Sequence, residues 1–138
     1  MAQSIRELMT QNPRTIEPTQ PVQEAARIMR DEDAGVVPIV EGERLVGVIT
    51  DRDIAIRVVA EGKDATQTAV RDAASTNLVT IDPQQDLDEA LRLMAKHQVR
   101  RLPVVEEDGR LVGVVAQADV ARHTDDQRTG ELVEEISK

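Results

Sequence analysis

Residues 44–53 read RLVGVITDRD and residues 110–119 read RLVGVVAQAD, so one pattern occurs twice in the chain. The likeness continues toward the N-terminus, where residues 15–18 (TIEP) match residues 80–83 (TIDP). One extra residue in the second copy, in the acidic turn at 106–109, shifts the register once. A match of this extent with a single gap indicates an internal duplication.

Each copy is predicted to follow the order β-α-β-β-α after a short leading helix, with repeat 1 at residues 1–66 and repeat 2 at residues 67–138. Pro18 and Pro83 stop the first strand of each copy, because proline cannot continue a β-ladder. Two apolar runs joined by a Gly-containing turn predict a hairpin. In the first copy we expect a helix over 4–9, strands over 15–16, 36–40 and 45–49, and a helix over 51–60 that ends at Gly62. Between the first two strands, a central helix is expected to start near Pro21. One face of this helix would carry Val22, Ala25, Ala26 and Met29.

The second copy repeats these elements, and Asp86 with Glu89 forms a capping-box pattern at the start of its central helix. We expect helix 68–74, strand 79–81, a helical face of Leu87, Ala90, Leu91 and Met94, strands 102–105 and 111–115, and a helix from Gln117 that fades by Asp125. Residues 130–138 would place Leu132, Val133 and Ile136 on one helical face, which could dock on its own module or on a partner.

The hairpin strands of both copies are apolar at nearly every position, so they need cover on both faces. Helices can cover one face, and the sheet of the other repeat is the obvious cover for the second. A repeat of about 60 residues buries only about 60% of its unfolded surface, so alone it would be marginal. We therefore predict an α/β (α+β) fold of two β-α-β-β-α repeats packed sheet to sheet, with pseudo-two-fold symmetry and two related clefts.

Hydrophobic residues make up 40% of the 138-residue chain and charged residues 31%, the range of a folded soluble protein. No apolar run approaches the roughly 20 residues that cross a bilayer, and the N-terminus lacks the order of a signal peptide. The absence of cysteine excludes disulfides, thiolate zinc sites and cysteine nucleophiles. We therefore expect a cytoplasmic protein without a membrane partner.

The chain has 26 acidic and 17 basic residues, a net charge of -9, and its basic residues are scattered. Such a surface repels nucleic acid, and no Phe, Tyr or Trp is present on which a base could stack. Nucleic acid is therefore not an expected partner. Aliphatic side chains each bury less area than a ring, so neighbouring subunits could be needed to complete the core.

The repeat unit, which closes on residues 47–53 (GVITDRD) in the first copy, resembles the CBS domain, and the pair resembles a Bateman module of the stand-alone bacterial type. The resemblance covers nearly all of the chain. It implies that the repeats pack through their sheets and that adenosine ligands such as AMP, ATP or S-adenosylmethionine occupy the clefts. It also implies that two modules join as a homodimer.

The family's ligand motif is Gly-apolar-apolar-Thr/Ser-any-any-Asp, in which the aspartate holds the ribose hydroxyls. A carboxylate can accept two hydrogen bonds from a vicinal diol, and the N–H groups that start the next helix face phosphate. Thr50 and Asp53 match the motif in the first copy. In the second copy Ala116 replaces the hydroxyl before Asp119.

By the family's rule, each cleft combines the motif of one repeat with the first two strands of the other. Aliphatic side chains would enclose the adenine, and paired arginines would bind phosphate. The first cleft is then expected to comprise Thr50, Asp53, Leu78, Val79, Val99, Arg100, Arg101 and Pro103. The second is expected to comprise Arg14, Thr15, Gly35, Val36, Pro38, Arg52 and Asp119, with Arg52 as its phosphate contact. Because the second lacks the hydroxyl and the arginine pair, the first is the favoured site.

Several of these residues also have a structural interpretation. Asp53 and Asp119 lie in the first turn of a helix, where acidic residues are favoured in any case. Thr50 can cap the same helix, and this role is compatible with binding. Arg100 and Arg101 follow a helix end, where cations complement the helix dipole.

Nothing in the sequence predicts a reaction. Asp51 and Asp53 resemble an acid/base dyad only in isolation, because no nucleophile or electrophilic partner accompanies them. His97 and His123 have no companion at metal-ligand spacing, so no metal site is expected. The glycines form neither a GxGxxG nor a P-loop pattern.

Three functions remain open at this point. The first is a regulator that senses AMP, ADP, ATP or S-adenosylmethionine and needs no cofactor. The second is an interaction or stress-response protein whose clefts stay empty, and the third, ranked well below, is a nucleotide hydrolase. No catalytic, channel or DNA-binding domain is recognisable in the sequence, so a regulatory output is expected to pass through a separate, unnamed protein partner.

Overall fold

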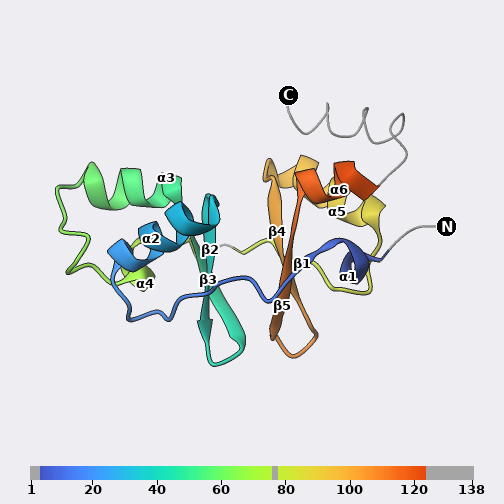
Figure 1. Ribbon diagram of the computed structural model, residues 1–138, viewed down its shortest axis with the longest axis horizontal. Coiled ribbons are helices and arrows are strands. Elements are labelled where there is room, and N and C mark those ends of the chain that lie inside the picture. Colours follow the sequence, from blue (N-terminus) through green and yellow to red (C-terminus); the bar gives the residue numbers. More distant parts are fainter. Residues whose placement is uncertain (1–3, 76–77, 124–138) are drawn as a thin grey trace. The chain divides into compact units, whose positions relative to one another are not determined.

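The computed structural model describes residues 4–75 and 78–123, which form two compact units. One unit, Arg14–Leu78, contains the hairpin of the first copy and is called the first-copy unit. The other joins Met1–Pro13 to Val79–Lys138 and is called the second-copy unit. Each unit combines helices with an antiparallel sheet, which confirms the predicted fold class (Figure 1).

The first-copy unit is built around one hairpin. Its strands pair antiparallel with Val36 opposite Thr50, and Gly42 makes the turn at φ +65°. The helices of this unit lie on one side of the hairpin (Figure 1). The elements are α2 (Val22–Glu32), β2 (Val36–Glu41), β3 (Arg44–Thr50), α3 (Asp51–Ile54), the π-helix η1 (Ala55–Val59) and α4 (Val70–Ala73).

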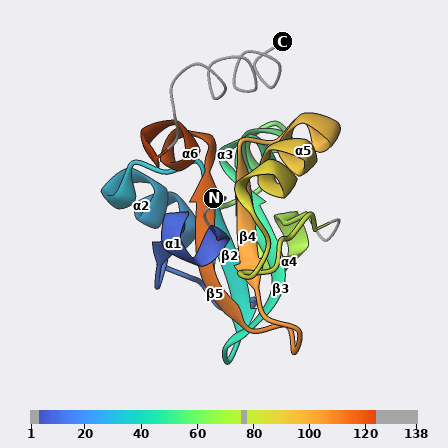
Figure 2. The same ribbon diagram turned by 90° about the vertical axis from the view of Figure 1, so that its right-hand side faces the viewer.

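The second-copy unit has a three-stranded sheet in the order β1-β5-β4, so β5 is the central strand (Figure 2). Its elements are α1 (Ile5–Leu8), β1 (Thr10–Gln11), α5 (Leu87–His97), β4 (Arg101–Val105), β5 (Leu111–Ala116) and α6 (Gln117–His123). The predicted hairpins are therefore confirmed in both copies. Asp125 and the helix expected over 130–138 lie outside the described residues.

Aliphatic side chains fill both cores, as the lack of aromatic residues requires. Ile16, Val22, Val37, Ile49, Val58 and Val70 are among the buried residues of the first-copy unit. Their counterparts in the second-copy unit include Ile5, Leu8, Ile81, Met94, Leu102 and Val115. None of the described helices is long and apolar enough to cross a membrane.

The first strand predicted for each copy is reduced to a single parallel bridge. Ile16 pairs with Ile39 and Ile81 pairs with Val104, each through two backbone hydrogen bonds of 2.9–3.1 Å. A proline follows two residues later in both copies, and proline cannot extend a ladder. The strand is therefore confirmed in place but is shorter than expected.

The leading helix of each copy packs with the other copy's hairpin. Helix α1 precedes the first hairpin in sequence, yet Ile5 and Leu8 are buried in the core of the second-copy unit. Helix α4 precedes the second hairpin, and Val70 and Ala73 are buried in the first-copy unit. The compact units are therefore divided at residues 13 and 78, not at the repeat boundary of 66.

The central helices follow the predicted periodicity with two corrections. Ala26 is exposed, and Ile28 is buried in its place, because the buried face of α2 is centred on Ala25, Ile28 and Met29. Pro21 is the extended N-cap residue of α2, so the helix begins at Val22.

The capping box predicted for α5 forms only in part. The Asp86 carboxylate accepts the Glu89 N–H at 3.0 Å, as expected. The Glu89 carboxylate instead forms a bidentate pair with Arg92, at 2.8 and 2.7 Å. Arg92 lowers the pKa of Glu89 through these bonds, because they favour the charged carboxylate.

The helix predicted over 51–60 is not regular throughout. It begins as α3 and continues as the π-helix η1, in which the Ala60 N–H donates to the Ala55 carbonyl at 2.9 Å. It then ends at Gly62, whose φ of +69° confirms the predicted left-handed cap. Sequence periodicity gave no sign of the wider turn.

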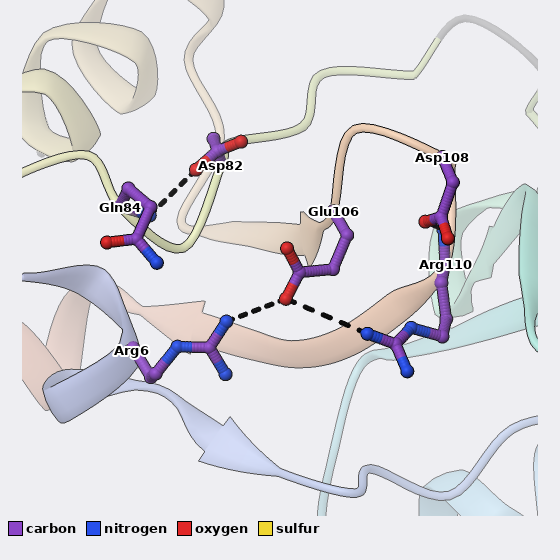
Figure 3. Close-up of polar contacts among 6 residues, drawn as sticks. All are labelled: Arg6, Asp82, Gln84, Glu106, Asp108 and Arg110. Carbon is purple, nitrogen blue, oxygen red and sulfur yellow. Dashed lines mark hydrogen bonds and ion pairs between the residues drawn. The ribbon is translucent and has the colours of Figure 1, made fainter.

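An ion pair ties α1 to the end of β4. Figure 3 shows the Glu106 carboxylate between the Arg6 and Arg110 guanidinium groups. Arg6 Nη2 lies 2.6 Å from Glu106 Oε1, and Arg110 Nη2 lies 3.9 Å from the same oxygen. In the first-copy unit, Arg71 corresponds to Arg6 and Glu41 to Glu106, and these two residues form no such pair within the described part of the chain.

We predict that Glu106→Gln lowers the free energy of unfolding by less than about 1 kcal/mol, because exposed ion pairs are weak. Both partners are partly exposed, at 45% for Arg6 and 27% for Glu106, so added salt should reduce the loss further. Chemical denaturation at low and high salt measures the effect. Glu41→Gln is the matched control and should be neutral, so equal losses in the two variants would contradict the prediction.

Candidate functional site

The strand–helix corner of the first-copy unit holds the predicted ligand motif. Strand β3 ends at Thr50, and α3 begins at Asp51. Thr50 Oγ1 accepts the Asp53 N–H at 3.0 Å, and Asp53 Oδ2 accepts the Thr50 N–H at 2.9 Å. This reciprocal capping box confirms that Thr50 caps the helix, and it fixes the Asp53 carboxylate at the corner.

Asp53 keeps one carboxylate oxygen free for a ligand. Its side chain is half-buried, and Oδ1 has no hydrogen-bond partner within the described residues. The carboxylate of the neighbouring Asp51 has a backbone partner, because its Oδ1 accepts the Arg52 N–H at 2.8 Å. The two aspartates therefore accept hydrogen bonds from different backbone donors.

The start of β2 lies at the same corner. The Asp51 N–H donates to the Gly35 carbonyl at 3.0 Å, and Val36 pairs with Thr50. A Cβ on Gly35 would lie 3.2 Å from Asp51 Oδ2, so this position is closely packed against the carboxylate. Gly35, Val36, Thr50 and Asp53 are thus brought together within one unit.

The corresponding corner of the second-copy unit differs in exposure. Asp119 Oδ2 accepts the Ala116 N–H at 2.9 Å, but Ala116 has no hydroxyl to complete a capping box. Asp119 is only 6% exposed, so its carboxylate is much less accessible than that of Asp53. Within this unit, Arg101 pairs with Ala116, and the Gln117 N–H donates to the Arg100 carbonyl at 2.9 Å.

The arginine pair is not part of a helix end. Helix α5 ends at His97, and Lys96 and His97 supply the cations of its last turn. Arg100 and Arg101 are exposed, and neither guanidinium has a hydrogen bond or an ion pair within the described residues. They are therefore available to an anion.

Each predicted cleft takes residues from both units, so its assembly stays a prediction. Thr50, Asp53 and Leu78 of the first cleft belong to the first-copy unit, and Val79, Val99, Arg100, Arg101 and Pro103 belong to the second-copy unit. Of the second cleft, Arg14, Thr15, Gly35, Val36, Pro38 and Arg52 lie in the first-copy unit and Asp119 in the other. Arg14 has an acidic neighbour, since its Nη1 lies 3.8 Å from Asp31 Oδ2.

Two structural features near the first corner were not predicted. Arg57, on η1, donates to the carbonyls of Ala73 and Ala74. Gly35 packs against Asp51. No local sequence signal identifies either contact, because each joins residues that are more than ten positions apart.

The chain thus contains a duplicated β-α-β-β-α unit with an aspartate at each strand–helix corner. The family model for the CBS domain matches residues 5–60 and 70–126, so this chain belongs to the CBS domain family. It contains two such domains in tandem.

The chain is similar to several stand-alone members of the family. It is 46% identical to the CBS domain-containing protein YhcV of Bacillus subtilis, over 86% of this chain and 83% of that protein. It is 40% identical to hypoxic response protein 1 of Mycobacterium tuberculosis, over 81% of this chain and 78% of that protein. A crystal structure of hypoxic response protein I matches with a TM-score of 0.82, 36% identity and coverage of 89% of this chain and 100% of that one.

A further solved structure is a CBS domain pair in complex with 5′-methylthioadenosine and S-adenosyl-L-methionine. It matches with a TM-score of 0.78 and 26% identity, over 88% of this chain and 95% of that one. The hypoxic response protein structure instead contains two coordinated zinc ions. The present chain has no cysteine, and its described residues contain no group of three His, Asp or Glu side chains that could hold a metal ion.

Proposed function

We propose that this chain is a regulatory module that binds one adenosine nucleotide at Asp53 and acts on a separate protein partner. The observation that carries the proposal is the Thr50–Asp53 corner. There the capping box orients the carboxylate and leaves Oδ1 free to accept from a ribose hydroxyl. The adenosine ligands of the related CBS pair support this chemical class.

We place the phosphates of the ligand on Arg100 and Arg101, with Leu78, Val79, Val99 and Pro103 around the adenine. Both arginines are exposed and have no acidic partner within the described residues. A guanidinium presents a planar fork of donors that matches phosphate oxygens. The assignment therefore favours AMP, ADP or ATP over an uncharged nucleoside.

Asp119 is not proposed as the principal site. Its carboxylate is buried, and Ala116 supplies no hydroxyl. The second predicted cleft would take its phosphate contacts from the start of β2, which carries Gly35 and Val36 where the second copy has two arginines. We therefore propose one working site per chain.

The protein is not proposed as an enzyme. The Thr50 hydroxyl beside Asp53 caps the helix, and the Asp51 carboxylate accepts a backbone N–H. A regulator instead requires only that the ligand bind two arrangements of the protein with different affinity. The same proposal places the protein in the cytoplasm, without a nucleic-acid or membrane partner.

The first test is thermal unfolding with AMP, ADP, ATP and S-adenosylmethionine at millimolar concentration. A ligand present at about 100 times its dissociation constant should stabilise the protein by about 2.7 kcal/mol. Native mass spectrometry of freshly purified protein should show a bound adenosine compound. If none of the four raises the melting temperature and no nucleotide co-purifies, the ligand-free interaction protein becomes the better description.

We also propose that two modules form a homodimer through η1. Ile56 and Val59 are the large apolar side chains that lie exposed in the described residues, at 48% and 70%. These two exposed side chains lie three positions apart on η1, and together they are called the apolar patch of η1. A second copy would remove this patch from water.

We predict that the double variant Ile56→Glu/Val59→Glu converts the dimer to a monomer, because two carboxylates would be buried without partners. Light scattering after size-exclusion chromatography measures the mass. The control is Arg30→Glu, which reverses the charge at an exposed position of α2 and should leave the mass unchanged. A wild-type protein that is monomeric at high micromolar concentration would contradict the proposal.

A further inference from the structure

Arg57 connects the helix after the Thr50–Asp53 corner to a segment distant in sequence. Its Nη1 donates to the Ala74 carbonyl at 3.1 Å and lies 3.5 Å from the Ala73 carbonyl. Ala73 is the last residue of α4, and Ala74 is its extended C-cap. Arg57 therefore binds the point at which the chain leaves α4.

The end of α4 needs such a partner. The last carbonyls of a helix have no intrahelical donor, and cations near them are stabilising. The corresponding helix α1 closes its own end, since the Met9 N–H donates to the Ile5 carbonyl at 2.9 Å. In α4 no equivalent bond from the Ala74 N–H to the Val70 carbonyl is found, and the Arg57 guanidinium instead donates to the carbonyls of Ala73 and Ala74 at the end of the helix.

The same segment is also held by the strand before the corner. The Ser75 N–H donates to the Val48 carbonyl at 3.1 Å, and the Val48 N–H donates to the Ser75 carbonyl at 3.3 Å. Val48 lies on β3, two residues before Thr50. Residues 73–75 are thus bonded both to the strand that enters the corner and to the helical segment that leaves it.

Arg57 lies in the middle of the π-helix η1, not in a regular α-helix. The wide hydrogen bonds continue past it, because the Lys63 N–H donates to the Val58 carbonyl at 2.9 Å. π-turns are rare and recur at functional sites. In the second copy the corresponding position is His123, so the arginine is specific to the first copy.

We propose that Arg57 is a positioning residue that couples the Thr50–Asp53 corner to residues 73–75. The inference rests on the proposed ligand site for its biological use. A ligand that binds Asp53 holds the start of α3, and Arg57 transmits this restraint to residues 73–75, which precede the Val79–Lys138 part of the second-copy unit in the chain. Ligand occupancy is thereby converted into a change at residues 73–75, just before the first-copy unit ends at Leu78.

The first experiment needs no ligand and measures hydrogen exchange at the Ser75 amide. Arg57→Ala should speed this exchange about fivefold, as expected for the loss of one hydrogen bond. Thr50→Ala, which removes the cap acceptor of Asp53, should speed it about threefold through Arg57. Because the connection is already broken in Arg57→Ala, the double variant should exchange no faster than Arg57→Ala alone.

Two further variants act as controls. Arg57→Lys keeps a cationic donor and should restore most of the protection. Arg30→Ala removes an exposed arginine of the same unit that bonds only to Asp31, and it should leave Ser75 unchanged. If the effects of Arg57→Ala and Thr50→Ala multiply in the double variant, the two positions act independently and the proposal is overturned.

The second experiment uses AMP as the probe. In the wild type, saturating AMP should slow Ser75 exchange by about threefold or more, whereas Arg57→Ala should bind AMP with a dissociation constant within about threefold and show no such change. A response that persists in Arg57→Ala would overturn the role of Arg57 but leave the ligand site intact. If AMP does not bind to the wild type, the proposed site fails for AMP. The hydrogen-exchange rates of the single and double variants without ligand then decide the role of Arg57.

Discussion

Gly113→Ala is expected to destabilise the protein by about 1–3 kcal/mol, the range for overpacking a filled site. Gly113 lies on β5, opposite Gln11 of the short strand β1. A Cβ added there would lie 2.6 Å from Met9 Sδ and 2.8 Å from the Thr10 carbonyl oxygen. The methionine side chain can move, but the carbonyl belongs to the backbone that pairs with β5. The substitution should therefore separate β1 from the sheet.

The first copy provides the matched control. Gly47 corresponds to Gly113, and a Cβ at Gly47 would lie 3.4 Å from the Ser75 carbonyl oxygen, which is ordinary contact. Gly47→Ala should therefore change the free energy of unfolding by less than about 0.5 kcal/mol, as for a substitution without a clash. Chemical denaturation of both variants measures the difference, and equal losses would contradict the prediction.

A double variant separates the two causes of the clash. Met9 corresponds to Ala74 in the first copy, so Met9→Ala imitates the more open site. In the Met9→Ala background, Gly113→Ala should cost less than in the wild type, because only the Thr10 carbonyl remains close. An unchanged cost would assign the whole effect to the backbone.

Asp53→Ala is expected to weaken adenosine-nucleotide binding by about 100-fold or more. Two hydrogen bonds from a ribose diol to a carboxylate are each worth about 1.5–3 kcal/mol when the acceptor is charged. The same variant loses half of the capping box, which should cost about 1 kcal/mol of stability. Isothermal titration calorimetry and chemical denaturation therefore report two separate effects of one substitution.

Asp51→Ala is the control for this loss. Asp51 lies on the same turn of helix, but its carboxylate is exposed and accepts the N–H of the next residue. Its removal should change the nucleotide dissociation constant by less than about threefold, since surface charges act weakly through solvent. If Asp53→Ala binds nucleotide as tightly as the wild type, the ribose assignment is wrong.

Much of the local structure could be predicted because its causes are local. The apolar spacing of Ala25 and Met29 marks the buried face of α2, and the Thr50–Asp53 spacing permits a cap. The capping box was nevertheless expected at Asp86 and Glu89, where Arg92 competes for the second carboxylate. A spacing rule cannot decide between two partners that are equally near in sequence.

In the candidate site, too, the sequence predicts some features and leaves others to tertiary packing. The sequence places a threonine and an aspartate at one strand–helix corner, and an alanine and an aspartate at the other. It does not show that Asp53 remains accessible while Asp119 is 6% exposed. Burial depends on every segment that packs around a side chain, and those segments come from many parts of the chain.

The sequence by itself therefore determined the duplication, the two hairpins, the helices and the position of the Thr50–Asp53 corner. Periodicity, proline and capping residues act over a few positions, so they can be read along the chain. Only the tertiary structure decided that α1 and α4 pack with the opposite copies, that Gly113 has no room for a side chain, and that Arg57 reaches Ala74. These features depend on distances between residues far apart in sequence, and packing alone sets such distances.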